Sequence, residues 1–119
     1  MYDHLGLKVS HLAASIRFYE SALAPLGHVL GSHDDSYAGI GPAGAPALWL
    51  YASEEAKGRG THVAFRAASH AAVDAFYQAG LKAGAEGNGG PGPRPDYSPT
   101  YYAAFLIDPD GNNVEAVCP

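Results

Sequence analysis

Apolar residues occupy every second position in two short stretches that lie far apart in the chain. They do so over residues 5–9 and again over residues 63–67, and polar or small residues fill the positions between them. Such a period of two is typical of a β-strand with one buried face. We therefore expect one strand to begin near His4 and a second to begin near His62.

Each of these strands is followed by apolar residues at helical spacing, which predicts two amphipathic helices. The first stripe stops at Pro25 and Gly27, and the second stops at Gly84, a favourable residue just beyond a helix. Ser10 and Ser69 precede the two stripes and are expected to be N-caps. The stripes consist of Leu12, Ile16, Tyr19 and Leu23, then Val73, Phe76, Tyr77 and Leu81.

Shorter apolar runs separated by turn residues complete each half of the chain. The sequences at 41–44 (GPAG) and 108–111 (DPDG) predict hairpin turns. The stretch from Gly87 to Pro99 has no periodicity and predicts a long loop, which in a compact domain is often functional. We expect strands at 28–31, 37–40 and 47–51, near Ala85, and at 101–107 and 114–117.

The two halves also resemble each other in sequence. A shift of 58 positions places His4 on His62, Phe18 on Phe76 and Tyr19 on Tyr77, with further identities between them. The chain therefore reads as an α+β fold made of two tandem βαβββ modules within one domain, residues 1–119. Module one covers about 1–52, a polar linker covers 53–60, and module two covers about 61–119.

Composition narrows the classes of partner. A chain of 119 residues with a net charge of −5 and no basic cluster is a poor candidate for binding nucleic acid or an anionic membrane. Its single cysteine excludes an internal disulfide and a cysteine-rich zinc site. No basic leader and no long apolar run is present, so we expect a cytoplasmic protein with a small-molecule partner.

The phase of the strands predicts a metal site. If the apolar side of each first strand packs under its helix, His4 and His62 point to the opposite face. Glu115 joins them if Val114 and Ala116 also face the helix. Two imidazoles and a carboxylate suit a divalent ion such as Fe, Mn, Zn, Ni or Co. The alternative is that the histidines are ordinary surface or core residues.

Further candidates crowd the long loop and the strand after it. Arg94 and Tyr102 are candidates for binding a polar substrate. The catalytic candidates are Glu115 and the hydroxyls of Tyr97 and Tyr101, which are candidate proton donors. The alternative is that these tyrosines pack the sheet or a dimer interface. Trp49 is a candidate wall of an apolar substrate pocket, or simply a core residue.

Two motifs resemble the vicinal oxygen chelate superfamily, which holds glyoxalase I, bleomycin-resistance proteins and extradiol dioxygenases. The run HLGLKVS from His4 to Ser10, followed by Ser15, Phe18 and Tyr19, resembles the N-terminal part of sequences in this superfamily. The stretch FLIDPDGNNVE, which ends at Glu115, resembles the C-terminal motif of the same superfamily. The resemblance implies a U-shaped, barrel-like sheet with the helices outside. It also implies a metal ligated by His4 and His62 from the first strands and by Glu115 from the last.

One position departs from the glyoxalase pattern. Trp49 stands where the first module of such enzymes supplies a fourth, acidic ligand, and an indole cannot do this. The resemblance still implies a lactoylglutathione lyase-like enzyme as the nearest named activity, and a homodimer. It leaves open a small extradiol-type dioxygenase and a metal-free protein that sequesters an antibiotic or another small molecule.

Overall fold

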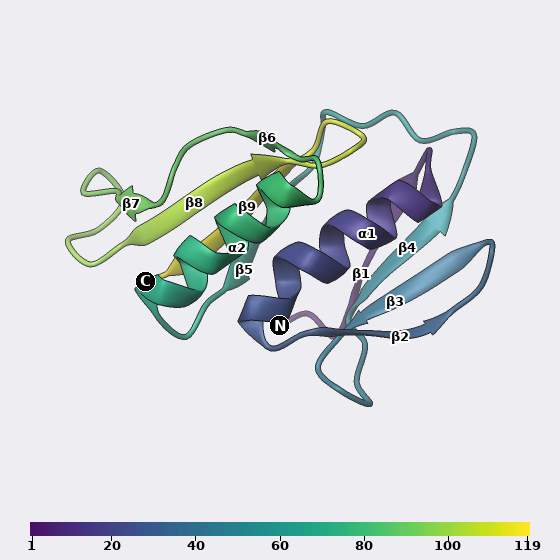
Figure 1. The fold of residues 1–119 in the computed structure, drawn as a ribbon, viewed down its shortest axis with the longest axis horizontal. Coiled ribbons are helices and arrows are strands. Elements are labelled where there is room, and N and C mark those ends of the chain that lie inside the picture. The colour runs from purple at the N-terminus through teal and green to yellow at the C-terminus, as the bar shows by residue number, and fades with distance from the viewer.

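The computed structural model describes all 119 residues, and its first module consists of one helix and four strands (Figure 1). A short 3-10 helix, η1, follows the α-helix and ends at Gly27, whose φ of 90° is left-handed. In chain order the elements are β1 (Leu5–Val9), α1 (Leu12–Leu23), η1 (Ala24–Leu26), β2 (Val29–His33), β3 (Tyr37–Gly41) and β4 (Leu48–Ala52).

The second module repeats this order of strands and α-helix without the 3-10 helix, and it has one additional strand. Within the stretch expected to be an unstructured loop, Gly92 and Pro93 form a very short strand that pairs with β8. The elements are β5 (His62–Arg66), α2 (His70–Lys82), β6 (Glu86–Gly87), β7 (Gly92–Pro93), β8 (Tyr102–Ile107) and β9 (Asn113–Cys118).

The two modules build two mixed sheets of matching topology. The first sheet has the order β1-β4-β3-β2, and the second has β5-β9-β8-β6 with β7 also on β8. In each, the first and last strands of the module run parallel and the others are antiparallel. The α+β class and the βαβββ duplication are confirmed. The register also confirms a finer point, since Trp49 pairs with Gly6 as Glu115 pairs with Ala64.

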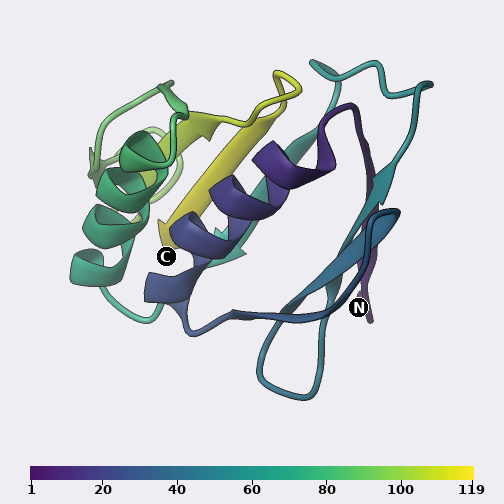
Figure 2. The ribbon, with the colours of Figure 1, turned by 45° about the vertical axis from the view of Figure 1, so that its right-hand side comes forward.

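The helices cover one face of each sheet and leave the other face free. Figures 1 and 2 show α1 and α2 side by side, with α1 over the first sheet and α2 over the second. The expected single U-shaped sheet is, within one chain, two sheets, because β1 and β5 are edge strands that do not pair with each other. We call the two uncovered surfaces the helix-free faces of the first and second sheets.

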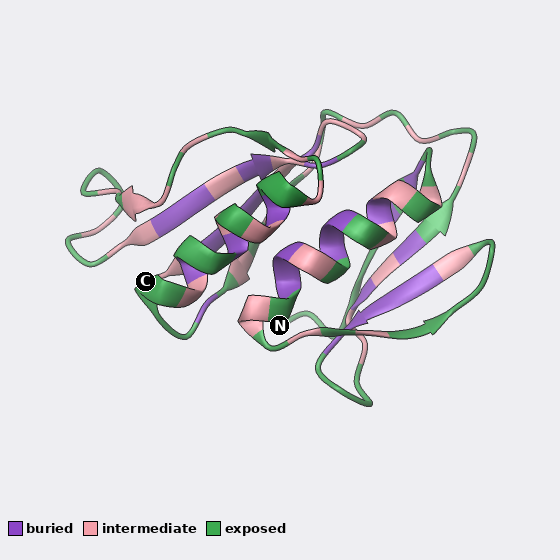
Figure 3. Ribbon diagram, viewed as in Figure 1, coloured by how far each residue is buried: buried purple, intermediate pink, exposed green.

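The core joins the two modules beneath the helices. Figure 3 shows the buried stripes of both helices against the buried centres of the strands. Phe18 and Phe76, which the sequence repeat places at equivalent positions, are both fully buried. Gly80 lets α2 pack closely on β8 of its own module and against α1, because a β-carbon there would collide with Leu106 and touch Phe18. Neither helix is long and apolar enough to cross a lipid bilayer.

One expected cap is confirmed and one is wrong. The Ser69 hydroxyl accepts a hydrogen bond from the Ala72 amide at 3.1 Å and caps α2. Helix α1 instead begins after His11, which makes no capping bond. Ser10 does not cap it, because its amide and hydroxyl both donate to the Asp110 carboxylate of the other module.

This contact is part of a polar junction between the modules. The buried Tyr19 hydroxyl of α1 donates to Asp108 Oδ2 at 2.6 Å. Asp108 also accepts from the backbone amides of Asp110 and Asn112, at 2.9 and 2.8 Å. The Asp108 carboxylate thus stabilises the DPDG turn through its own backbone amides, and it anchors the second module to the first helix. We call Ser10, Tyr19, Asp108 and Asp110 the module junction.

Candidate functional site

Two of the predicted metal ligands meet on the helix-free face of the second sheet. Strands β5 and β9 run parallel, with Ala64 opposite Glu115. His62 lies two residues before Ala64 on the same face, so its ring can reach the carboxylate. The His62 Nε2 atom lies 2.8 Å from Glu115 Oε2.

The Glu115 carboxylate is buried and held from both sides. Its residue is 2% exposed, whereas the His62 side chain is 55% exposed. The Tyr101 hydroxyl donates to Glu115 Oε1 at 2.6 Å. This hydrogen bond, together with burial and the nearby charge, raises the pKa of Tyr101 to about 12. The hydroxyl therefore stays protonated at neutral pH and acts as a donor.

Aromatic side chains and an arginine surround this pair. Tyr97 packs edge-on against Tyr101 with ring centroids 5.1 Å apart, and the Phe105 ring centre lies 6.4 Å from that of His62. The Arg94 guanidinium lies 5.4 Å from the centre of the Phe105 ring. Arg94 also donates to the backbone carbonyls of its own loop, at 2.7 Å to Gly90. It thereby holds the loop against this face.

Two other predicted residues do not join the cluster. Tyr102 lies on the helix-facing side of β8, where its hydroxyl donates to Asp74 of α2 at 2.7 Å and its ring stacks on His70. His4 belongs to the first module, is 58% exposed at its side chain, and pairs with Asp3 at 2.6 Å. Accordingly, no three metal-ligating side chains come together within one chain.

Trp49 lies on the helix-free face of the first sheet, with Tyr37 and Tyr51. The Tyr37 and Trp49 rings have centroids 6.1 Å apart and are tilted by 39°. Glycines lie beneath two of these three rings, since a β-carbon on Gly39 would lie 2.6 Å from Trp49 and one on Gly6 would lie 3.1 Å from Tyr51. We call Tyr37, Trp49 and Tyr51 the aromatic face.

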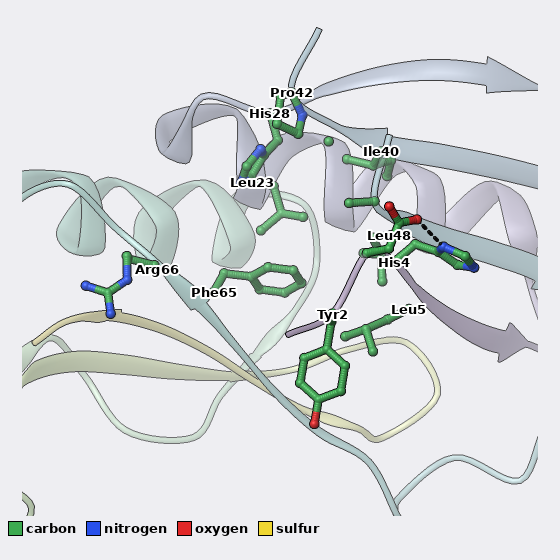
Figure 4. Close-up of a pocket in the computed structure, with 13 residues that line it drawn as sticks. Tyr2, His4, Leu5, Leu23, His28, Ile40, Pro42, Leu48, Phe65 and Arg66 are labelled. Carbon is green, nitrogen blue, oxygen red and sulfur yellow. Dashed lines mark hydrogen bonds and ion pairs between the residues drawn. The ribbon is translucent and has the colours of Figure 1, made fainter. Parts of the chain in front are cut away.

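A separate cavity of about 480 Å³ opens between the modules (Figure 4). Leu48 and Phe65 line it from the helix-facing sides of the two sheets and Leu23 lines it from α1, and Glu115 does not border it. His28 also lines it, and burial lowers the pKa of this imidazole. Sequence analysis missed this cavity, because nothing in the local pattern indicates that Leu48 and Phe65 border a common space.

The donor atoms present fit part of a metal's coordination shell. Two ligand atoms about 2.1 Å from one ion, at right angles to each other, lie about 3.0 Å apart. The 2.8 Å between His62 Nε2 and Glu115 Oε2 is close to that separation. A neutral imidazole nitrogen and a carboxylate oxygen are also a usual donor pair for Zn, Mn, Fe, Co or Ni.

The comparisons with known proteins agree with this fold and duplication. A profile described as the Glyoxalase/Bleomycin resistance protein/Dioxygenase superfamily matches residues 2–116. The chain belongs to this superfamily. No curated protein matches it.

Solved structures of the glyoxalase/bleomycin resistance/dioxygenase superfamily resemble the chain over its whole length. A glyoxalase/bleomycin resistance protein from Albidiferax ferrireducens T118 is 30% identical, with a TM-score of 0.83 over 100% of this chain and 99% of that chain. A candidate glyoxalase from Bacillus halodurans is 27% identical, with a TM-score of 0.75 over 100% and 96%. A superfamily protein from Nocardioides is 25% identical, with a TM-score of 0.65 over 96% and 80%.

Proposed function

We propose that this protein is a divalent-metal-dependent enzyme that acts on a small substrate with two adjacent oxygen atoms. The ion would be held by His62 and Glu115 of one chain and by His4 of a second copy. The observation that carries the proposal is the buried Glu115 carboxylate, whose Oε2 atom lies 2.8 Å from the imidazole of His62. The nearest named activity is that of a lactoylglutathione lyase.

The site requires a second chain for physical reasons. A divalent ion in a catalytic site commonly takes three protein ligands, and one chain brings together two. Strands β1 and β5 are unpaired edges, and the helix-free faces beside them carry exposed aromatic residues such as Tyr51 and Tyr97. A homodimer that brings two such faces together would cover these surfaces and add His4 to the site.

A metal bound there would act as a Lewis acid toward the oxygens of the substrate. The chain's own residues orient the carboxylate ligand. Tyr101 holds Glu115 Oε1, which leaves Oε2 directed at His62. Because the pKa of Tyr101 is raised to about 12, its hydroxyl is a hydrogen-bond donor and not a base. Tyr97, 65% exposed, packs on Tyr101 beside this pair.

Metal titration calorimetry tests the site directly. We expect one ion per chain for the wild type, and at least a tenfold lower affinity for Glu115→Gln, His62→Ala and His4→Ala. Glu86→Gln, a change of an exposed acid in the same sheet, is the matched control and should bind as the wild type does. Equal binding by the wild type and Glu115→Gln would overturn the proposal.

Mixing two defective chains tests whether the site is shared. In a shared site, His4→Ala and Glu115→Gln homodimers each lack a ligand at every site. A heterodimer of the two keeps one intact site, so random exchange restores about a quarter of all sites. If each chain held its own complete site, mixing would restore none.

A second candidate is a metal-free protein that sequesters a small molecule. The aromatic face favours it, because Tyr37, Trp49 and Tyr51 offer stacking surface without any ion. Thermal-shift measurements separate the two functions. Stabilisation by an aromatic antibiotic with no effect of Zn, Mn or Ni would support sequestration.

A further inference from the structure

We propose that Asp3 is a positioning residue for the metal site, because it holds the proton of the His4 ring on Nδ1 and leaves Nε2 free to bind the ion. This inference rests on the proposed function, in which His4 completes the site of a second copy. The observation that carries it is the 2.6 Å contact between Asp3 Oδ1 and His4 Nδ1, drawn as the dashed line at His4 in Figure 4.

The contact fixes which ring nitrogen of His4 carries the proton. An ionised carboxylate only accepts hydrogen bonds, so Nδ1 is the donor. In a neutral imidazole the other nitrogen, Nε2, then keeps its lone pair, which is what a metal ion binds. Of the six histidines in the chain, only His4 and His62 contact a carboxylate. His4 is therefore in its ligating form before the ion arrives.

A bend in the chain brings the two side chains together. Neighbouring side chains of a regular strand point to opposite faces, which would separate Asp3 from His4. The chain bends at Asp3 and becomes a regular strand only at Leu5, whose amide donates to the Ala47 carbonyl at 2.8 Å. Strand β1 thus anchors the backbone directly after His4, and Asp3 restrains the ring itself.

The sequence repeat shows that this arrangement is particular to the first module. The shift of 58 positions that pairs His4 with His62 places Thr61 opposite Asp3. Thr61 has no carboxylate, and His62 instead meets Glu115 through Nε2 at 2.8 Å. Each imidazole has one carboxylate partner, but on opposite ring nitrogens. In the metal-free chain the two neutral histidines therefore hold opposite tautomers, and the Nε2 atom of His62 must give up its proton when an ion binds there.

Asp3 acts through His4 and is not a ligand of the same ion. With metal–nitrogen bonds of about 2.1 Å, an ion on Nε2 lies about 6–7 Å from an oxygen that is bound to Nδ1 of the same ring. The charge of Asp3 still matters, since a divalent ion with two neutral imidazoles and the Glu115 carboxylate keeps one positive charge. Partners that bind the free nitrogen of a ligating imidazole commonly change metal affinity by about ten- to a hundred-fold.

Heteronuclear NMR of the imidazole nitrogens tests the tautomer in metal-free protein kept in chelator, at about pH 8.5, where imidazoles are neutral. The His4 signals are identified by their absence in His4→Ala. We expect the proton of His4 on Nδ1 in the wild type, and the loss of this preference in Asp3→Ala. Asp35→Ala, which removes another exposed acid of the first module, is the matched control and should keep it. A wild-type proton on Nε2, or the same tautomer in Asp3→Ala, would overturn the inference.

Metal titration calorimetry then separates positioning from direct ligation. We expect Asp3→Ala to lower the affinity by about tenfold, and to have no further effect in a chain that already carries His4→Ala. No loss in Asp3→Ala, or a loss that persists in the His4→Ala background, would contradict a role exerted through His4. A wild type that binds no ion would overturn the proposed function, whereas a failed NMR test with intact metal binding would overturn this inference alone.

Discussion

Replacing Tyr19 by phenylalanine tests whether the module junction stabilises the fold. The Tyr19 hydroxyl is fully buried and donates to Asp108 Oδ2, and both burial and the charge of Asp108 raise the pKa of Tyr19. It is therefore a protonated donor at any pH at which the protein is studied. Tyr19→Phe removes this donor from Asp108.

The magnitude follows from the remaining bonds of Asp108. A hydrogen bond to a charged group contributes about 1.5–3 kcal/mol. After the substitution Oδ2 keeps one donor, the Asn112 side-chain nitrogen at 3.0 Å. We therefore expect a loss of about 2 kcal/mol in the free energy of unfolding, measured by urea denaturation. For a domain of this size that corresponds to a Tm lower by about 8 °C.

The sequence repeat supplies the control. Tyr77 occupies the equivalent position in α2, is partly buried, and its hydroxyl has no hydrogen-bond partner. Tyr77→Phe should change stability by less than about 0.5 kcal/mol. If Tyr19→Phe and Tyr77→Phe unfold at the same urea concentration, the junction does not stabilise the fold and the reasoning is refuted.

Three further predictions concern the two helix-free faces. Tyr101→Phe should lower metal affinity by about ten- to a hundred-fold in calorimetry, because it removes the hydrogen bond to Glu115 Oε1. Tyr97→Phe should have little effect, and equal losses in the two variants would contradict the role of the Tyr101–Glu115 hydrogen bond. The pKa of Tyr101 is raised from 10.0 to about 12, so the hydrogen bond of Tyr101 to Glu115 contributes fully to stability below pH 10 and is lost as the pH rises toward 12. Ultraviolet titration should show a lower pKa of Tyr101 in Glu115→Gln, and an unchanged titration would exclude the hydrogen bond between the two side chains. Gly39→Ala should displace Trp49, shift its fluorescence and cost about 1–3 kcal/mol in denaturation, whereas Gly90→Ala, with open space around it, should do neither; a silent Gly39→Ala would show that the ring is not held flat.

The sequence predicted the repeat and therefore most of the fold. The period-two and helical stripes are local signals, so the paired strands and both helices were placed within a residue or two of their observed ends. The phase of the strands also placed His62 and Glu115 on one face. The resemblance matched Trp49 to Glu115 as the position of the acidic ligand in the first module, and the register of both parallel pairs confirms that match.

What the sequence could not predict depends on contacts between distant residues. Ser10 has the local chemistry of an N-cap, but its hydroxyl donates a hydrogen bond to the Asp110 carboxylate of the other module. Whether His4 meets His62 depends on how the two sheets sit relative to each other, which no local pattern encodes. Tyr102 is different, because alternation along β8 already puts it on the opposite face from Ala103 and Phe105, and that signal was available.

The equivalence of Trp49 and Glu115 has a consequence for how such a chain can diverge. The duplicated strands carry polar chemistry in one half and ring surfaces in the other, and the two sets share no side chain. Under the proposed function, substitutions at Tyr37, Trp49 or Tyr51 would change which molecule is accepted and leave His62 and Glu115 unchanged. Under that function, the duplicated halves would let selectivity and reactivity evolve separately.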